Sequence, residues 1–358
     1  MAKADVVFAG TKPVDPRHRF DEAMLELWML ENVEGYEGAL TVSQFKGGQS
    51  NPTYRLDSPA GTYVLRRKPF GALLPSAHAV DREFRVISAL HRVGFPVARP
   101  YALCTDETVI GAVFYVMSLV EGRVYWDGAL PDCTPEQRRD LYEAMIGTLA
   151  RLHQIDYAAI GLADYGKPGN YFTRQVDRWT RQYRASETEP ITAMDRLIDW
   201  LPRTAPEQTR TSIVHGDYRF DNLIMDADEP RVAAVLDWEL STLGDPLADF
   251  SYLLMNWALP HDGRSSLGGL DLPALGIPTQ DEAIALYCEL TDREGVPDLD
   301  WYFAYNLFRL AAILQGIAGR VRDGTATSPQ AVEMAARAPR LAEAAWDFAQ
   351  RSKRGGDA

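Results

Sequence analysis

Two nearby segments of the chain carry the side chains best suited to chemistry. The first, residues 213–224, reads Ile-Val-His-Gly-Asp-Tyr-Arg-Phe-Asp-Asn-Leu-Ile and contains Asp217 and Asn222. The second follows an apolar run and places Asp237 at the start of Asp-Trp-Glu. A carboxylate beside an alcohol can accept its proton, and an amide oxygen with a second carboxylate can bind the Mg²⁺ of a nucleoside triphosphate. Together these three side chains indicate phosphoryl transfer.

The spacing within the first segment is specific. His215, Gly216 and Asp217, with Asn222 five residues after the aspartate, resemble the catalytic loop of protein kinases, which has arginine where this chain has glycine. Apolar residues on both sides predict two strands joined by this loop. In this interpretation Asp217 is the catalytic base, and Asn222 and Asp237 are metal ligands. The alternative is an ordinary polar hairpin in which Asp217 and Asn222 only form the turn.

A kinase also needs a loop that covers the triphosphate, and an early hairpin offers one. Adjacent glycines and small polar residues allow backbone N–H groups to approach phosphate oxygens closely, although most glycine pairs are simply turns. The candidate residues of this loop are Gly47, Gly48, Gln49, Ser50 and Asn51.

The next strand and helix offer a phosphate clamp. In kinases a strand lysine holds the phosphates and pairs with a helix glutamate. The matching residues here are Glu83 and Arg66, and arginine departs from the pattern but can bind phosphate bidentately. Because strand side chains alternate, Lys68 shares the face of Arg66 and is the competing candidate, whereas Arg67 should point away and be dispensable. The alternative for Glu83 is a surface charge on its helix.

The order of apolar patterns predicts strands first and helices afterwards. Strands are expected at 40–45, 54–57, 62–68, 101–104 and 112–117, with helices at 22–33 and 76–91. Later helices are expected at 134–153, 174–183, 193–201, 281–290, 299–321 and 329–350, with one more after an Asp245 cap. This order predicts an α+β, protein-kinase-like two-lobe fold, with an antiparallel sheet and a helix in the N-terminal lobe and a mainly helical C-terminal lobe.

The lobe boundaries follow from where the strands stop. We expect the N-terminal lobe at 1–117, a hinge at 118–122 and the C-terminal lobe at 123–358. In a kinase-like fold the backbone of the hinge, at Ser118 and Val120, would bind the adenine edge. The alternative is an ordinary strand exit.

Charge and composition limit the kinds of partner. The 358 residues suffice for two cores, and 46% hydrophobic and 24% charged residues are typical of a globular protein. The net charge of −13 and the absence of a long Lys/Arg run argue against nucleic acid and against an anionic membrane surface. We therefore expect neither partner.

Cysteine usage and the N-terminus bear on the compartment. Cys104, Cys133 and Cys288 form no Cys-x-x-Cys pair, which indicates reduced thiols. Residues 1–19 lack the apolar core of a signal peptide, and no run of about 18 apolar residues would span a membrane. A cytoplasmic location is expected, and the oligomeric state is left open.

Nearly the whole chain resembles the aminoglycoside phosphotransferase and choline kinase family. Glycine in the catalytic loop and Asp-Trp-Glu at 237–239 are typical of that family, and residues 48–54 and 63–69 resemble the branch that is also found fused to acyl-CoA dehydrogenase domains. The resemblance implies ATP as co-substrate, Mg²⁺ and a small-molecule acceptor with a hydroxyl group, such as a hydroxyacyl-CoA. It also implies that Asp249 braces the catalytic loop.

Candidate contacts to the acceptor lie on both sides of the catalytic residues. Tyr218, Arg219 and Trp238 flank the predicted site. Tyr305 belongs to an aromatic stretch at 301–308 that would form the wall of an acceptor pocket. For all four residues the alternative is packing or solvation.

Two other classes of protein are weighed against the kinase interpretation. One is a nucleotide-binding pseudokinase or interaction module, and intact Asp217, Asn222 and Asp237 argue against it. The other is a flavin dehydrogenase, for which the sequence offers no site. An acyl-CoA dehydrogenase name on such a chain would be inherited from fused relatives.

Overall fold

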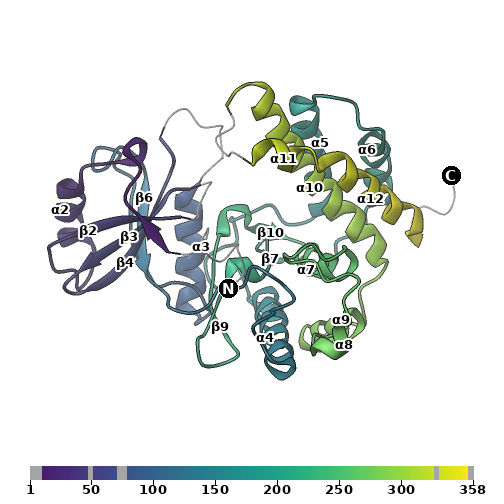
Figure 1. The fold of residues 1–358 in the computed structure, drawn as a ribbon, viewed down its shortest axis with the longest axis horizontal. Coiled ribbons are helices and arrows are strands. Elements are labelled where there is room, and N and C mark those ends of the chain that lie inside the picture. Colours follow the sequence, from purple (N-terminus) through teal and green to yellow (C-terminus); the bar gives the residue numbers. More distant parts are fainter. Residues whose placement is uncertain (1–9, 47–50, 71–78, 326–329, 354–358) are drawn as a thin grey trace.

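The N-terminal lobe is built on an antiparallel sheet. The computed structural model describes residues 10–46, 51–70, 79–325 and 330–353 (Figure 1). The spatial order of the strands is β1-β2-β3-β4-β6-β5. The strands are β1 (Thr11–Lys12), β2 (Thr41–Phe45), β3 (Thr53–Ser58), β4 (Gly61–Arg67), β5 (Pro100–Cys104) and β6 (Phe114–Ser118). The two-lobe α+β fold predicted from the sequence is confirmed.

Each face of this sheet meets a different helix. Helix α2 (Glu22–Asn32) packs on one face, where Leu65 of β4 lies in a buried apolar cluster. The other face meets α3 (Val80–Arg92), which Figure 1 shows between the sheet and the C-terminal lobe. Because side chains alternate along β4, Arg66 faces α3 and Arg67 faces the α2 side. The sheet therefore presents Arg66 on the face that meets α3.

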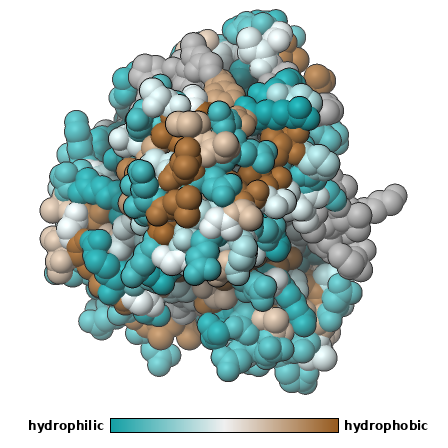
Figure 2. All heavy atoms as spheres, turned by 90° about the vertical axis from the view of Figure 1, so that its left-hand side faces the viewer, coloured by the Kyte–Doolittle hydropathy of each residue, from teal (hydrophilic) through white to brown (hydrophobic). Residues whose placement is uncertain are grey.

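The outer surface of α2 is unusually apolar. The helix buries Leu25 and Met29 against the sheet, but Met24, Leu27 and Leu30 are 43%, 59% and 50% exposed. Figure 2 shows apolar side chains gathered on this outer side of the N-terminal lobe. This apolar surface lies on the α2 side of the sheet, and Arg66 lies on the opposite face.

The C-terminal lobe is mainly helical. The long helix α10 packs against α5, α7 and α12. The helices are α4 (Pro135–Gln154), α5 (Tyr171–Ser186), α6 (Thr192–Thr204), α7 (Pro246–Ala258), α8 (Leu272–Leu275), α9 (Gln280–Leu290), α10 (Leu299–Arg322), α11 (Ala331–Ala335) and α12 (Ala338–Arg351). Across the part of the chain that the structure describes, no helix has the length and apolar character needed to cross a membrane.

Two small antiparallel strand pairs carry the predicted catalytic segments. Strand β7 (Ser212–Val214) pairs with β10 (Thr242–Gly244), and β8 (Leu223–Met225) pairs with β9 (Val232–Val235). Short 3-10 turns at Phe220–Asn222 (η2) and Trp238–Leu240 (η3) connect them. The loop that holds Asp217 follows β7, and the loop that holds Asp237 follows β9, so each pair contributes one of the two loops.

The chain leaves the sheet lobe through a tight contact with the second pair. Arg123 and Met225 exchange backbone hydrogen bonds of 2.8 Å in both directions. Gly122 has a φ of 152°, and a Cβ there would lie 2.3 Å from the Met225 carbonyl oxygen. Only glycine fits this approach. The segment between the lobes is therefore anchored directly to the strand that follows the catalytic loop.

Some boundaries differ from those predicted. The helix expected at 76–91 is seen from Val80, and residues 76–78 lie outside the described part of the chain. The single helix expected at 329–350 is divided into α11 and α12, because Pro339 stands in the first turn of α12 and cannot continue a preceding helix. Helix α8 was not expected in the glycine-rich stretch.

Candidate active site

The loop that carries Asp217 is braced by a buried carboxylate. Asp249 of α7 accepts the backbone N–H groups of His215 and Gly216, the latter at 2.7 Å. Gly216 has a φ of 89°, and a Cβ there would lie 3.0 Å from Leu240. Glycine at this position is therefore required by the backbone and by close packing, which explains the departure from the arginine of protein kinases.

His215 joins the two motif segments. Its Nδ1 accepts the backbone N–H of Asp217 at 3.2 Å, so its Nε2 carries the proton and donates to the Leu236 carbonyl at 2.8 Å. The ring also meets Trp238 edge-on, with centroids 4.8 Å apart. This fully buried histidine fixes the position of the catalytic loop relative to the strand end that carries Asp237.

The carboxylate of Asp217 is held by three side chains. Tyr252 donates its hydroxyl to Oδ1 at 2.7 Å, Asn222 donates its amide to Oδ2 at 2.9 Å, and Arg219 Nε lies 3.3 Å from Oδ1. Burial alone would raise the pKa of Asp217, but the charge of Arg219 and the Tyr252 hydrogen bond outweigh it and lower the pKa. Asp217 is thus an ionised, oriented carboxylate that can accept a proton.

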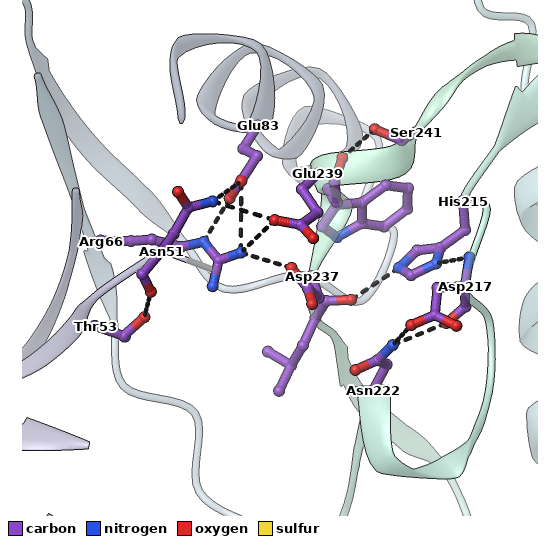
Figure 3. A network of polar contacts seen from close by, with 12 residues as sticks. Asn51, Thr53, Arg66, Glu83, His215, Asp217, Asn222, Asp237, Glu239 and Ser241 are labelled. Carbon is purple, nitrogen blue, oxygen red and sulfur yellow. Dashed lines mark hydrogen bonds and ion pairs between the residues drawn. The ribbon is translucent and has the colours of Figure 1, made fainter. Parts of the chain in front are cut away.

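Asn222 and Asp237 fit a magnesium ion. The Asn222 amide nitrogen is used on Asp217, and Figure 3 shows its oxygen on the side where Asp237 lies. Asp237 has left-handed backbone angles (φ 62°, ψ 64°) that present a carboxylate 36% exposed. Within the described ranges no group of three or more His, Cys, Asp or Glu side chains could hold a metal. Two oxygen ligands, with phosphates and water completing the shell, match the usual protein chemistry of Mg²⁺.

Arg66 connects the sheet to this carboxylate (Figure 3). Its Nε donates to Glu83 Oε2 at 2.7 Å, and its Nη2 donates to Asp237 Oδ1 at 2.5 Å. Glu83 also accepts the hydroxyl of Tyr115 at 3.1 Å. Lys68 instead lies 3.7 Å from Asp81 at the surface. The structure therefore pairs Arg66, rather than Lys68, with the helix glutamate.

The expectation for Arg67 was half right. Its side chain does point to the opposite face, where Nε donates to the Tyr54 hydroxyl at 3.1 Å and the guanidinium lies over Phe70. It is, however, completely buried. Truncation would leave a cavity and remove one partner of the Tyr54 hydroxyl, so Arg67 is a structural residue and not a dispensable one.

Of the loop residues predicted to bind the nucleotide phosphates, the structure describes only Asn51. Gly47, Gly48, Gln49 and Ser50 lie outside the described residues. Asn51 is fully buried and donates its side-chain amide to Glu83 at 3.0 Å.

The proposed adenine contact of Ser118 needs correction. Its N–H already donates to the Arg99 carbonyl at 2.8 Å, and its hydroxyl accepts the Arg99 N–H at 3.0 Å. The Ser118 N–H is therefore used within the sheet lobe. Val120 lies farther along, between β6 and Gly122, outside any strand.

Three of the four acceptor candidates belong to the core. Tyr218 is fully buried and donates to the Met145 carbonyl at 2.8 Å, and Trp238 is 3% exposed and donates to the Val235 carbonyl at 3.0 Å. Tyr305 is fully buried and stacks on Trp301, so the aromatic stretch of α10 packs the lobe and is not a pocket wall. Arg219 alone is half-buried, with 35% of its side chain exposed.

Sequence reasoning missed two residues that shape the site. Tyr252 of α7 binds Asp217, and Arg309 of α10 donates to the Gly216 carbonyl while lying 5.4 Å from the Tyr252 ring centroid. A usable signal existed for Arg309, because an arginine within a long apolar helix pattern is rarely buried without a specific partner. No pattern in the sequence distinguishes Tyr252 from a core tyrosine.

Comparison with known proteins agrees with this geometry. The family model described as "Phosphotransferase enzyme family" matches residues 41–283. A crystal structure of a candidate aminoglycoside phosphotransferase from Ralstonia eutropha is 52% identical, with a TM-score of 0.86 and coverage of 94% of this chain and 100% of that chain. Aminoglycoside phosphotransferase APH(4)-Ia, in ternary complex with AMP-PNP and hygromycin B, shares the fold at 14% identity, with a TM-score of 0.58 and coverage of 90% and 98%.

A curated relative carries a different name. Mouse "Acyl-CoA dehydrogenase family member 10" is 46% identical over 346 residues, which is 95% of this chain but 32% of that protein. The chain thus spans about a third of the length of this relative, in which a domain like it is fused to an acyl-CoA dehydrogenase. The matched family range contains Arg66, Glu83, Asp217, Asn222 and Asp237. The chain belongs to the phosphotransferase enzyme family.

Proposed function

We propose that this protein is an ATP-dependent small-molecule kinase that transfers the γ-phosphate of ATP to an acceptor hydroxyl. The observation that carries the proposal is the Asp217 carboxylate. It is ionised, held by Tyr252 and Asn222, and placed on a braced loop next to Asp237. That arrangement combines a proton acceptor with a pair of magnesium ligands, which is the combination phosphoryl transfer requires.

The residues divide the reaction between them. Asp217 orients the acceptor hydroxyl and takes its proton as the oxygen bonds to the γ-phosphorus and the bond to the β-phosphate oxygen breaks. Asn222 and Asp237 would hold Mg²⁺, which would supply positive charge to the phosphates. Arg66, fixed by Glu83, binds phosphate oxygens. Most of the acceleration comes from positioning and charge stabilisation in this preorganised site.

The N-terminal lobe supplies the cover over the nucleotide. We assign phosphate contacts to Gly47, Gly48, Gln49, Ser50 and Asn51, of which only Asn51 lies in the described part of the chain, and adenine contact to the Val120 backbone of the hinge at 118–122. In this proposal the nucleotide binds at the boundary between the two lobes, residues 1–117 and 123–358. The support is the order of elements and the position of Arg66 on the face toward α3.

For the acceptor we propose a hydroxyacyl thioester or a similar alcohol. Relatives in which a like domain is fused to an acyl-CoA dehydrogenase support an acyl substrate. The half-buried Arg219 lies 3.3 Å from Asp217 and 3.1 Å from Asp221, and it offers a cation to an anionic acceptor such as an acyl-CoA. Arg219 is then the side chain that meets the acceptor.

Release of ADP tests the proposal. The protein is incubated with ATP, Mg²⁺ and a panel of hydroxylated metabolites that includes 4-hydroxyacyl-CoAs and kanamycin. We expect turnover with a hydroxyacyl-CoA, none with kanamycin, and loss of turnover in Asp217→Asn. Nucleotide binding without turnover on any acceptor would favour the pseudokinase alternative, and efficient kanamycin phosphorylation without thioester turnover would reverse the acceptor assignment.

A further inference from the structure

Arg66 stands among more carboxylates than it can neutralise. Its Nη2 lies 2.5 Å from Asp237 and 4.0 Å from Glu239, while its Nε lies 2.7 Å from Glu83. One guanidinium and three carboxylates carry a formal charge of −2, and the sum stays negative even without the charge of Glu83, whose pKa is raised by burial. A triphosphate that approaches Arg66 therefore meets a group of side chains with the same sign of charge as itself.

Glu239 is held in this cluster by the N-terminal lobe. Asn51 donates its amide to Glu239 Oε2 at 3.4 Å and to Glu83 Oε1 at 3.0 Å (Figure 3). Asn51 is fully buried, and the Glu239 side chain is 24% exposed. The same Oε2 atom thus faces both Asn51 and Arg66. Its negative charge is fixed beside the guanidinium that is proposed to bind phosphate.

The roles of the other two carboxylates differ from that of Glu239. Glu83 accepts hydrogen bonds from Arg66, Tyr115 and Asn51, so its carboxylate serves to orient Arg66. Asp237 is a proposed magnesium ligand, and Mg²⁺ would engage its carboxylate. Glu239 lies two residues beyond Asp237 on η3 and has neither task in the proposed reaction.

We propose that Glu239 makes the nucleotide site selective for the magnesium complex of a nucleoside triphosphate over the metal-free form. Like charges repel, so the Glu239 carboxylate raises the free energy of a bound triphosphate in proportion to the charge that the triphosphate carries. Mg²⁺ cancels part of that charge and also engages Asp237, so the penalty falls mainly on the free nucleotide. This inference rests on the proposed kinase function.

The test measures nucleotide binding rather than activity. ATP is titrated calorimetrically into wild type and Glu239→Gln, once with excess Mg²⁺ and once with EDTA. Glutamine keeps the length of the side chain and can still accept from Asn51, so it removes the charge alone. We expect the Kd in EDTA to fall about tenfold and the Kd with Mg²⁺ to change by less than about threefold, because one charge near the phosphates has been removed.

Two matched variants separate charge from shape. Glu239→Asp keeps the charge and should retain most of the discrimination between the two forms of ATP. Glu107→Gln removes the same charge from the exposed turn between β5 and β6 and should match wild type in both titrations. A thermal melt without ligand reports whether each variant folds.

The outcomes distinguish this inference from the proposed function. Wild type that binds Mg·ATP, with Glu239→Gln unchanged in EDTA or weaker by the same factor in both buffers, would overturn the inference alone. Wild type that binds no nucleotide in either buffer would overturn the proposed function and the inference with it. A tighter Kd in EDTA that Glu107→Gln reproduces would assign the effect to overall charge and also overturn the role of Glu239.

Discussion

The nucleotide side and the acceptor side of the candidate active site differ in where their residues come from. On the nucleotide side, Asp217, Asn222 and Asp237 occur within 21 positions of one another, and Arg66 and Glu83 lie 17 apart. On the acceptor side, Asp217 is shaped by Tyr252 and Arg309, 35 and 92 positions farther along. The first side depends on short loops, and the second depends on how distant helices pack.

This difference explains why the nucleotide side could be predicted from the sequence and the acceptor side could not. A short loop between two strands fixes the spacing of its side chains, so residue type and offset nearly determine the geometry. A helix such as α10 presents apolar residues to whatever lies beside it, and the same pattern suits a core or a pocket wall. In this protein the aromatic stretch of α10 serves the core.

The largest effect expected on the nucleotide side is loss of the base. Asp217→Asn preserves size but removes the proton acceptor, so kcat should fall by on the order of 10²-fold or more, with nucleotide affinity little changed. Steady-state kinetics and an ATP titration measure the two quantities. Asp164→Asn, at the exposed N-terminal side of α5, is the matched control and should behave as wild type. Turnover at the wild-type rate would remove Asp217 from the mechanism.

The next effect concerns the metal. Asp237→Ala removes a full charge from the proposed Mg²⁺ ligands, so the affinity for ATP with Mg²⁺ should fall by about tenfold or more and the stimulation by Mg²⁺ should largely vanish. Calorimetry with and without Mg²⁺ measures it. Asp228→Ala, in the exposed turn between β8 and β9, removes the same charge elsewhere. Identical titrations for wild type and Asp237→Ala would contradict the assignment.

Individual residues show how much of the candidate site could be predicted from the sequence. The loop geometry of Asp217 and Asn222 and the pairing of Arg66 with Glu83 follow from offset and strand alternation. The N–H of Ser118 is not open to adenine because it is used on Arg99, the residue before β5, and the pairing of β5 with β6 is not evident from the local sequence. Tyr218 and Trp238 failed because adjacency in sequence to a catalytic residue does not decide which way a side chain points.

A smaller effect tests the clamp. Arg66→Ala would leave the buried Glu83 without its counter-charge, at a cost of about 3–5 kcal/mol in stability, so lysine is the better substitution. Arg66→Lys keeps a charge but loses the fork that reaches Glu83 and Asp237 together, so the ATP KM should rise by about three- to tenfold and kcat should fall less. Lys68→Ala should change both by less than about twofold. If Lys68→Ala is the damaging variant, Lys68 is the phosphate ligand.

The smallest effect tests the acceptor side, where no sequence pattern marked Tyr252. The Tyr252 hydroxyl helps to lower the pKa of Asp217, so Tyr252→Phe should raise that pKa. The base is active when ionised, and a higher pKa means that it loses its charge at a higher pH as the solution is acidified. The acid limb of the kcat/KM profile should therefore move toward higher pH, while the rate above it changes by less than about tenfold.

The pH profile distinguishes this role from simple packing. Burial raises the pKa of Tyr252 itself, so its phenol stays protonated and acts only as a donor to Asp217 across the working range. A packing defect would lower the rate equally at every pH, and Tyr101→Phe in the N-terminal lobe should leave the profile unchanged. An acid limb that stays in place in Tyr252→Phe would mean that Arg219 and the other nearby charges hold Asp217 ionised without Tyr252, and that helix α7 matters for shape but not for the charge of the base.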